Sequence, residues 1–260
     1  MKLVRNSLAK LICGDYSQHK SLENLYQVLF HNISNIETRL GNLLINGAAG
    51  DLTVLGPYFA RNLLETTCAA LLGRIDPFRL IYVQKVQSLD GFTIGSKAKG
   101  AISWSSDIFE KNDIDINNLW DHNREFSKVG RGLFGNHYGE IFWNPAFRTL
   151  IDDSTYVSEL SLEYFRTHID SPEKFILFIR QKSSILYSSL SKGIHSELVI
   201  NPEIIYDDTT VIELVNDTFQ VCSILGIVSH YIDFSICRLP IDTAFQYYND
   251  LFEWRERGHD

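Results

Sequence analysis

The sequence predicts an all-α protein: a helical bundle with a glycine-rich irregular insertion in the middle of the chain. Asp76-Pro77, Asn144-Pro145 and Ser171-Pro172 each place a capping side chain before a proline. The fixed φ and missing N–H of proline suit the first position of a helix. Long stretches also repeat apolar residues at the spacing of a helix that buries one face. We therefore expect several capped, amphipathic helices.

The expected helices before the glycine-rich middle are three. The first takes Ser21 as its cap and covers SLENLYQVLFHNISNIETRLGNLL. The second begins near Asp51 and ends at Gly73, and Gly56-Pro57 is expected to kink it or to delay its start to the proline. The third runs from Pro77 through FRLIYVQKV.

The expected helices after the middle are long as well. The one that follows Pro172 contains FILFIRQKSSILYSSLSK and stops at Gly193, because glycine adopts the left-handed conformation at little cost. The next begins near Asp208 or Thr209 and is apolar nearly all round in its second half, which predicts packing on several sides. The last covers roughly residues 240–257.

The segment 88–139 differs from the rest because glycines and aromatic residues recur in it without helical periodicity. Irregular stretches of this length inside compact domains are commonly functional or flexible. We expect residues 1–260 to form a single helical domain, with 88–139 an irregular insertion or a small subdomain.

Composition and charge restrict the function. Apolar residues make up 45% and charged residues 22% of the chain, which are ordinary globular values. The net charge of -8 is unlike that of a stand-alone nucleic-acid binder, so RNA binding requires a local basic patch or a basic partner. The four cysteines form no CxxC pair, which indicates free thiols in a reducing cytoplasm.

The N-terminus and the apolar runs give no membrane signal. Arg5, Asn6 and Lys10 interrupt the first apolar stretch, unlike the core of a signal peptide. No run approaches the roughly 18 apolar residues of a spanning helix. We expect a cytoplasmic protein without membrane contact, with a protein partner or a second copy of itself.

The first candidate site is the helix end LYSSLSKGIHSELV, where Lys192, His195 and Glu197 surround the expected stop. A His near the last turn of a helix can bond free carbonyl oxygens. It can also act as a general acid or base, since His titrates near neutral pH and Lys192 or Glu197 can tune it.

The second candidate site is RGLFGNHYGEIFWNP, where five residues separate Arg131 from His137 and Glu140 follows. His137 and Glu140 would share a face of a helix, but the two glycines between Arg131 and His137 favour a loop. A third place is FARNLLETT, where Arg61 and Glu65 lie one turn apart, either as an intrahelical ion pair or as part of a polar site that faces the His195 element.

A metal-dependent reaction has one weaker candidate. Ser96 follows a glycine in TIGSKAKG, and Asp113 and Asp115 alternate in NDIDIN, as do the residues that hold Mg²⁺ and phosphates in minimal nucleotidyltransferases. The surroundings lack the alternating strands of that family. No zinc pattern, Walker motif or dinucleotide fingerprint is present, so we expect no cofactor.

The helix with LYSSLSKGIHSELV, the apolar VIELVNDTFQVCSILGIVSHYI and the earlier ARNLLETTCAALL together resemble the helical HEPN superfamily. Many prokaryotic members occur in antiviral defence or toxin–antitoxin systems. The resemblance covers about residues 20–87 and 155–255. It implies a metal-independent endoribonuclease that uses an Arg and a nearby His, usually across a dimer interface.

The resemblance maps incompletely onto this chain. His195 takes the place of the family's His, but Ser189 stands six residues before it, where the Arg is expected. Either a distant residue such as Arg180 or Arg61 supplies the guanidinium, or the chain binds RNA without catalysis. Three hypotheses stay open: a HEPN-like component that cleaves or binds RNA, a non-enzymatic subunit of a larger complex, and a nucleotidyltransferase.

Overall fold

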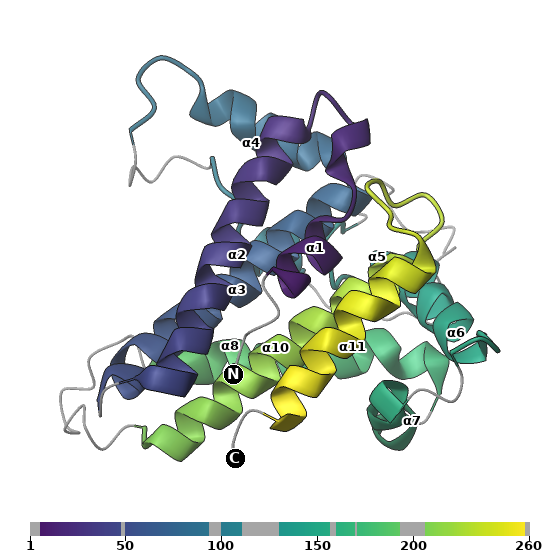
Figure 1. Cartoon of the computed structure of the whole chain (residues 1–260). Coiled ribbons are helices and arrows are strands. Elements are labelled where there is room, and N and C mark those ends of the chain that lie inside the picture. Colours follow the sequence, from purple (N-terminus) through teal and green to yellow (C-terminus); the bar gives the residue numbers. More distant parts are fainter. Residues whose placement is uncertain are drawn as a thin grey trace.

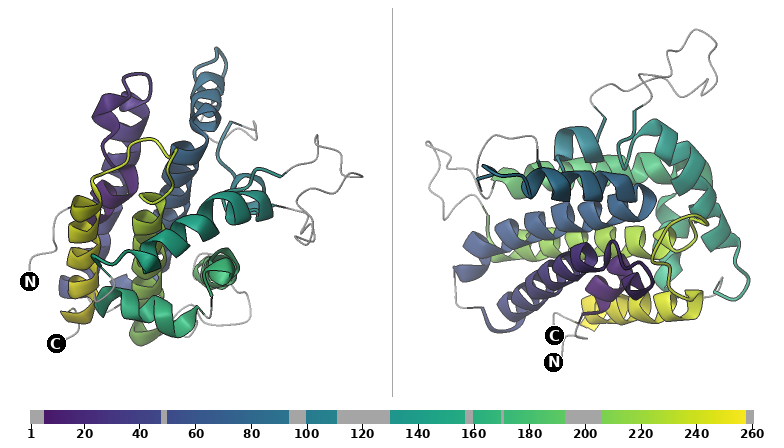
Figure 2. Two further views of the ribbon diagram at one scale, coloured as in Figure 1. Left: turned by 90° about the vertical axis from the view of Figure 1, so that its right-hand side faces the viewer. Right: turned by 90° about the horizontal axis from the view of Figure 1, so that it is seen from above.

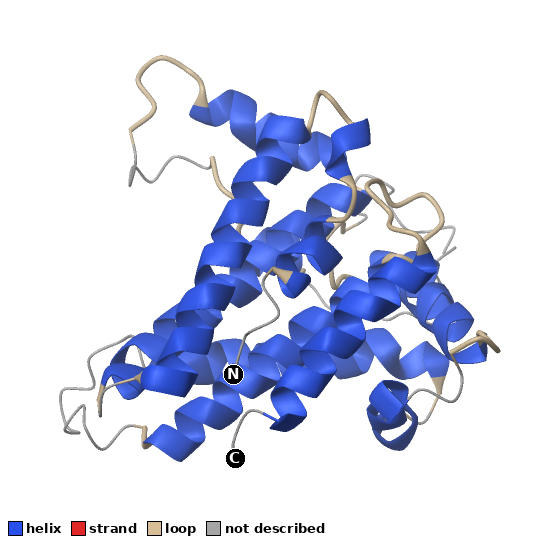
Figure 3. Cartoon of the chain, viewed as in Figure 1, coloured by secondary structure: helices blue, strands red, loops and turns tan. Residues whose placement is uncertain are grey.

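Every regular element of the computed structural model is a helix, which confirms the all-α class for the part of the chain that the structure describes (Figure 3). That part comprises residues 6–47, 50–93, 100–110, 130–156, 160–169, 171–192 and 206–257.

Two long helices, α3 (Asp51–Ile75) and α10 (Asp208–Ser229), lie side by side through the middle of the molecule (Figures 1 and 2). Helix α2 (Glu23–Asn46) packs on α3, and α11 (Ile241–Arg257) packs on α10. Helix α8 (Phe175–Lys192) packs against both central helices. The expected long helices are therefore all present.

Helix α10 is the core helix of the bundle. All residues from Thr218 to Ser229 are buried, which confirms the packing expected of its apolar second half. By length and composition alone α10 could cross a membrane, and 72% of its apolar window is buried inside the protein. That burial is typical of a helix packed among other helices.

The short helix α1 (Ser7–Cys13) lies between the long ones and was not expected from the sequence. Six of its seven residues are buried, and it contacts α2, α3, α10 and α11. It ends at Gly14, whose φ is 62° and whose Cα lies so close to the Cys237 carbonyl that an added Cβ would stand 1.7 Å from that oxygen. Arg5, Asn6 and Lys10 interrupt the apolar stretch, so the sequence did not indicate this core helix.

The remaining elements are short and lie around the bundle. Ile108, Leu133 and Phe134 are at most 1% exposed, so the described parts of segment 88–139 contribute to the main core. The short elements are η1 (Tyr16–Gln18), α4 (Pro77–Gln87), η2 (Trp104–Ile108), α5 (Asn136–Tyr138), η5 (Gly139–Trp143), α6 (Asn144–Asp152), η6 (Leu160–Leu162), α7 (Glu163–His168) and η7 (Pro172–Lys174).

The helix starts agree with the proline signals, but most of the expected caps are wrong. Helix α4 begins at Pro77, yet Asp76 makes no side-chain capping bond. Ser21 does not cap α2, which begins two residues later. Asn144 lies inside a helix that continues from η5, and its Oδ1 accepts from the Ile176 N–H of α8 at 3.0 Å. For Asn144, a tertiary partner on α8 replaces the expected local role.

Two other helix starts have different explanations, one local and one tertiary. Asp207 caps α10, because its Oδ1 accepts a hydrogen bond of 2.7 Å from the Thr210 N–H. Helix α3 begins at Asp51 and runs through Pro57, so the expected delay of its start is wrong. Gly56 lies against Val211 of α10, where a Cβ would stand 2.5 Å from Cγ1. Burial of this turn against α10 outweighs the hydrogen bond that the proline removes.

Candidate functional site

The helix-end candidate is described only in part. Lys192 is the last described residue of α8 and is exposed. Gly193, His195 and Glu197 lie outside the described residues. The expected helix stop at Gly193 and the catalytic role of His195 therefore stay predictions.

The structure gives Arg131 and His137 opposite environments. The Arg131 side chain is exposed, and its carbonyl oxygen accepts a hydrogen bond of 3.5 Å from Arg79 Nη2. His137 is 7% exposed within the one-turn helix α5. A buried imidazole and an exposed guanidinium do not form one open site, although their spacing in the sequence suggested it.

Arg180 lies beside the α5 segment. Its Nη1 donates a hydrogen bond of 2.6 Å to Asn136 Oδ1, which joins the middle of α8 to the residue before His137. The structure therefore brings Arg180, predicted as a distant partner of His195, to the other histidine segment.

Arg61 is the predicted residue with the most developed surroundings. Its Nε lies 3.1 Å from Glu65 Oε1, which confirms the expected ion pair within α3. Its Nη2 donates a hydrogen bond of 2.6 Å to the hydroxyl of Tyr187 on α8. The guanidinium carbon also lies 4.4 Å from the centroid of the Tyr187 ring, a cation–π distance.

Trp104 of η2 continues this arrangement. Its ring stacks on the Tyr187 ring with centroids 4.2 Å apart and an interplanar angle of 6°. Phe109 contacts Trp104 at 5.3 Å between centroids, and Phe134 contacts Phe109 at 5.6 Å, which ties the array to the core. We call Arg61, Tyr187 and Trp104 the Arg61 stack; it joins α3, α8 and η2.

The Arg61 stack is partly open to solvent. The Arg61 and Glu65 side chains are 24% and 40% exposed. Burial, followed by the charge of Glu65, raises the pKa of Tyr187, so its phenol is neutral at neutral pH. Stacked aromatic rings beside a guanidinium are found both where single-stranded bases stack and at protein-binding hot spots. The sequence pointed to Arg61 but to neither ring, because Trp104 and Tyr187 meet only in the fold.

Metal and small-molecule sites receive no support from the described residues. Among them, no group of three or more His, Cys, Asp or Glu side chains is placed to hold a metal ion. Ser96, Asp113 and Asp115, the nucleotidyltransferase candidates, lie outside the described ranges. A small pocket of about 20 Å³ between α10 and α11 is lined by Ser161, Phe219, Gln220, Ser223, Tyr248, Leu251 and Phe252.

The polar atoms of this pocket already have partners. Ser161 Oγ donates to Asn249 Oδ1 at 2.7 Å, and Lys182 Nζ donates to Gln220 Oε1 at 2.8 Å. Because these polar groups are already hydrogen-bonded within the protein, they are not left to bind a ligand, and the pocket adds nothing to the candidate site.

A second Arg–His pair was missed in the sequence. Arg74, at the end of α3, and His230, directly after α10, are both 0% exposed, and Arg74 Nη2 lies 3.2 Å from His230 Nδ1. His230 lies 156 positions after Arg74 in the sequence, so their spacing does not indicate that they form a pair. Complete burial excludes substrate from this pair in the folded state.

Comparison with known proteins gave no match to a family model, to a curated protein or to a solved structure. The resemblance to the HEPN superfamily therefore stays a prediction from the sequence, and the function rests on the geometry alone.

Proposed function

We propose that this chain is a HEPN-like component of a prokaryotic defence or toxin system and that it binds single-stranded RNA at the Arg61 stack. One observation supports the site: a guanidinium and two parallel aromatic rings, from three separate elements, lie together at a partly exposed surface. Bases stack on such surfaces regardless of sequence, at about 1–3 kcal/mol per base.

The charge around the stack predicts the character of the binding. Glu65 offsets the charge of Arg61, and the whole chain carries -8. Few phosphates are neutralised in such a complex, so affinity depends weakly on salt and mainly on stacking. A basic partner protein would supply the missing charge.

RNA binding is tested by fluorescence anisotropy with a labelled single-stranded oligonucleotide. Tyr187→Ala and Trp104→Ala should each weaken binding about 5- to 150-fold, the equivalent of about 1–3 kcal/mol. Tyr82→Ala, which removes a tyrosine that is 54% exposed on α4, is the matched control and should bind like the wild type. Equal affinity of all four proteins, with circular dichroism confirming their folds, would contradict this site.

Cleavage is a separate question from binding. A metal-independent endoribonuclease should cut RNA in the presence of EDTA, and His195→Ala should abolish the cutting while leaving the anisotropy signal intact. Binding without cutting assigns the chain a recognition role only.

A second function, that of an interaction subunit, is favoured by α4. Leu80 is its only buried residue, and an apolar face stays open, with Phe78 70%, Tyr82 54% and, just past the helix, Leu89 64% exposed. An exposed apolar face is typical of a protein-binding site. Phe78→Glu should then abolish co-purification with the product of a neighbouring gene without changing RNA affinity. Unchanged co-purification would reject this face.

A further inference from the structure

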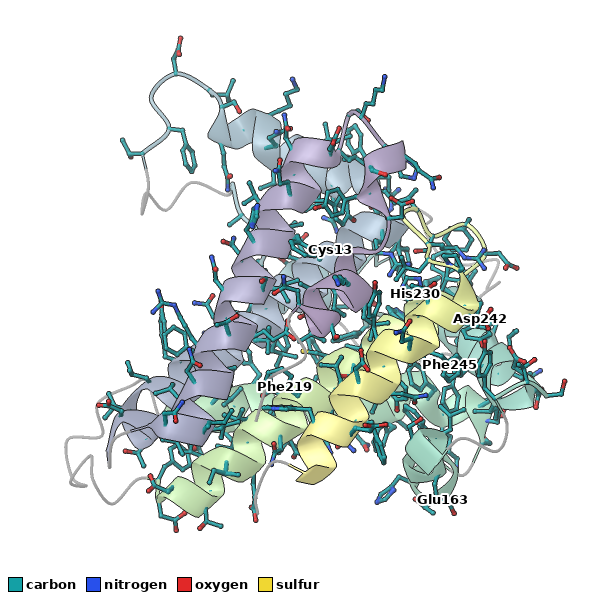
Figure 4. The ribbon with its side chains drawn as sticks, viewed as in Figure 1. Cys13, Glu163, Phe219, His230, Asp242 and Phe245 are labelled. Carbon is teal, nitrogen blue, oxygen red and sulfur yellow. The ribbon has the colours of Figure 1, made fainter. Side chains whose placement is uncertain are left out.

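The interior holds a polar junction where four parts of the chain meet. Arg74 enters from α3 and His230 from the end of α10. The end of α1 supplies the carbonyl oxygen of Leu11, and the segment before α11 supplies the N–H of Leu239. We call Arg74, His230 and these backbone groups the Arg74–His230 joint. Figure 4 shows His230 at the end of the bundle where the 230–240 segment begins, with Cys13 of α1 nearby.

The hydrogen bonds of His230 require a neutral ring with one defined tautomer. Nε2 lies 2.8 Å from the Leu11 oxygen, and a carbonyl oxygen only accepts, so Nε2 carries the proton. The Leu239 N–H donates to Nδ1 at 3.0 Å, so Nδ1 keeps its lone pair. The ring thereby ties α1 to the segment that leads into α11.

Arg74 makes a second proton on His230 unfavourable. It donates to the Ile236 oxygen from Nε at 3.0 Å, and from Nη1 to Ser229 Oγ at 2.6 Å and to the Ile12 oxygen at 3.3 Å. Among the described residues it forms no ion pair with a carboxylate. A proton on Nδ1 would place an imidazolium 3.2 Å from this guanidinium.

No carboxylate contacts the ring among the described groups around the joint, and His19 faces the segment instead, where its Nε2 accepts a hydrogen bond of 3.4 Å from the Cys237 N–H. Arg238 donates to the His230 carbonyl oxygen at 2.9 Å, and its own partner Asp233 is 98% exposed. Tyr26 of α2, Cys13 of α1 and Cys237 face Arg74. Burial raises the pKa of each of these three groups, so they are neutral near pH 7.

We propose that the Arg74–His230 joint is an acid-sensitive lock: protonation of His230 at Nδ1 releases residues 231–240, and with them the start of α11, from α1 and α3. The protonated Nδ1 becomes a donor that faces two donors, the Leu239 N–H and Arg74 Nη2. Both contacts are lost together, while the packing of α3 on α10 is untouched. This lock is independent of the RNA site.

The direction of the pH dependence follows from the same geometry. Burial first, and the Arg74 charge second, lower the pKa of His230 well below its ordinary 6.5. The open state therefore binds more protons below pH about 6.5. The equilibrium constant for opening rises as pH falls through this range, by at most about tenfold per pH unit for one proton.

The four cysteines provide a local readout. Cys237 lies in the segment to be released and Cys13 beside it, whereas Cys68 and Cys222 lie in α3 and α10; all four are buried. Labelling with 4,4′-dithiodipyridine, followed by peptide mass spectrometry, gives a rate for each thiol. The two conditions are about pH 7.5 and about pH 5.5, one unit on either side of the ordinary His pKa of about 6.5.

In the wild type, acid should speed labelling of Cys237 and Cys13 at least fivefold relative to Cys68 and Cys222. His230→Gln keeps a donor and an acceptor but does not titrate, so this acceleration should disappear. His31→Gln, at an exposed position of α2, is the matched control and should retain it.

Two results would overturn the lock. One is acceleration of all four cysteines together in the wild type, which means global unfolding. The other is acid acceleration that persists in His230→Gln. If His230→Gln does not fold, His230→Asn replaces it, and the order of labelling in the wild type alone decides between local and global opening.

Discussion

Arg61 and Arg74 lie on the same helix, thirteen residues apart, and do opposite work. Arg61 is partly exposed and contacts two side chains, Glu65 and Tyr187. Arg74 is fully buried and donates mainly to backbone oxygens, those of Ile12 and Ile236. The two sites differ in what each guanidinium and its partners would interact with if their contact were broken.

For Arg61 the alternative to its partners is water, so the energy at stake is small and the group stays available to a ligand. Arg74 is 0% exposed and so does not reach bulk solvent, and the carbonyl oxygens that it satisfies would otherwise be buried without donors. Arg61 is available to a ligand at the surface, whereas Arg74 holds the end of α1 to the segment that precedes α11. Four substitutions, three of them with a matched control, sharpen this comparison.

The largest effect is expected from Arg74→Met. It removes the donors of two buried carbonyl oxygens and of Ser229. We expect a loss of about 3–5 kcal/mol in the free energy of unfolding, measured in urea. Arg61→Met should lose under about 1 kcal/mol. Equal losses would mean that burial does not distinguish the two sites.

Glu37 extends the comparison of buried and exposed charged residues, because it is buried against the start of α1. Its side chain is buried, Oε1 accepts from the Leu8 N–H at 3.4 Å, and burial raises its pKa to about 8. Because the folded-state pKa is raised, stability is full below pH 4.5 and is lost as pH rises through about 8. The loss is on the order of 5 kcal/mol, from about 1.4 kcal/mol for each pKa unit of the shift.

Glu37→Gln should remove this pH dependence, as measured by thermal unfolding between about pH 4 and about pH 9, a range that brackets the titration. Glu65→Gln, beside Arg61 on the surface, is the control and should leave the wild-type profile unchanged. A Glu37→Gln profile that keeps the alkaline loss would assign that loss to another group.

Gly14→Ala tests the close approach at the end of α1. A Cβ would stand 1.7 Å from the Cys237 oxygen on a residue with φ of 62°. We expect a loss of about 1–3 kcal/mol in unfolding free energy. Gly50→Ala has φ of 95° but no atom within 4 Å of the added Cβ, so it isolates the backbone cost. Gly14→Ala should be the more damaging.

The smallest effect on stability is expected from Arg61→Lys. The charge is kept, but the planar group that lies over Tyr187 is lost. Stability should change by less than about 1 kcal/mol, while RNA affinity should fall about fivefold, in line with the lower end of stacking energies. A lysine variant that binds RNA like the wild type would show that only the charge matters.

The long helices were predictable because periodicity and proline are local signals: Pro77 begins α4, and the apolar second half of α10 is buried. The caps were less so, because Asn144 has a stronger partner in Ile176 of another helix. Of the candidate site, Arg61 and its ion pair with Glu65 follow from a one-turn spacing. Trp104 could not be found, since its stacking on Tyr187 depends on the packing of η2 against the bundle.

Helix α1 has a consequence for how the chain is made. The Ile12 carbonyl oxygen accepts from Arg74 and the Leu11 carbonyl oxygen from His230, which lies 219 positions after Leu11 in the sequence. During translation α1 precedes α3 and α10, so it remains without its final partners until residue 230 has been synthesised. Such distant pairing slows folding and leaves an apolar segment exposed to chaperones in the meantime. Nascent chains that end before residue 230 should therefore not yet bury α1.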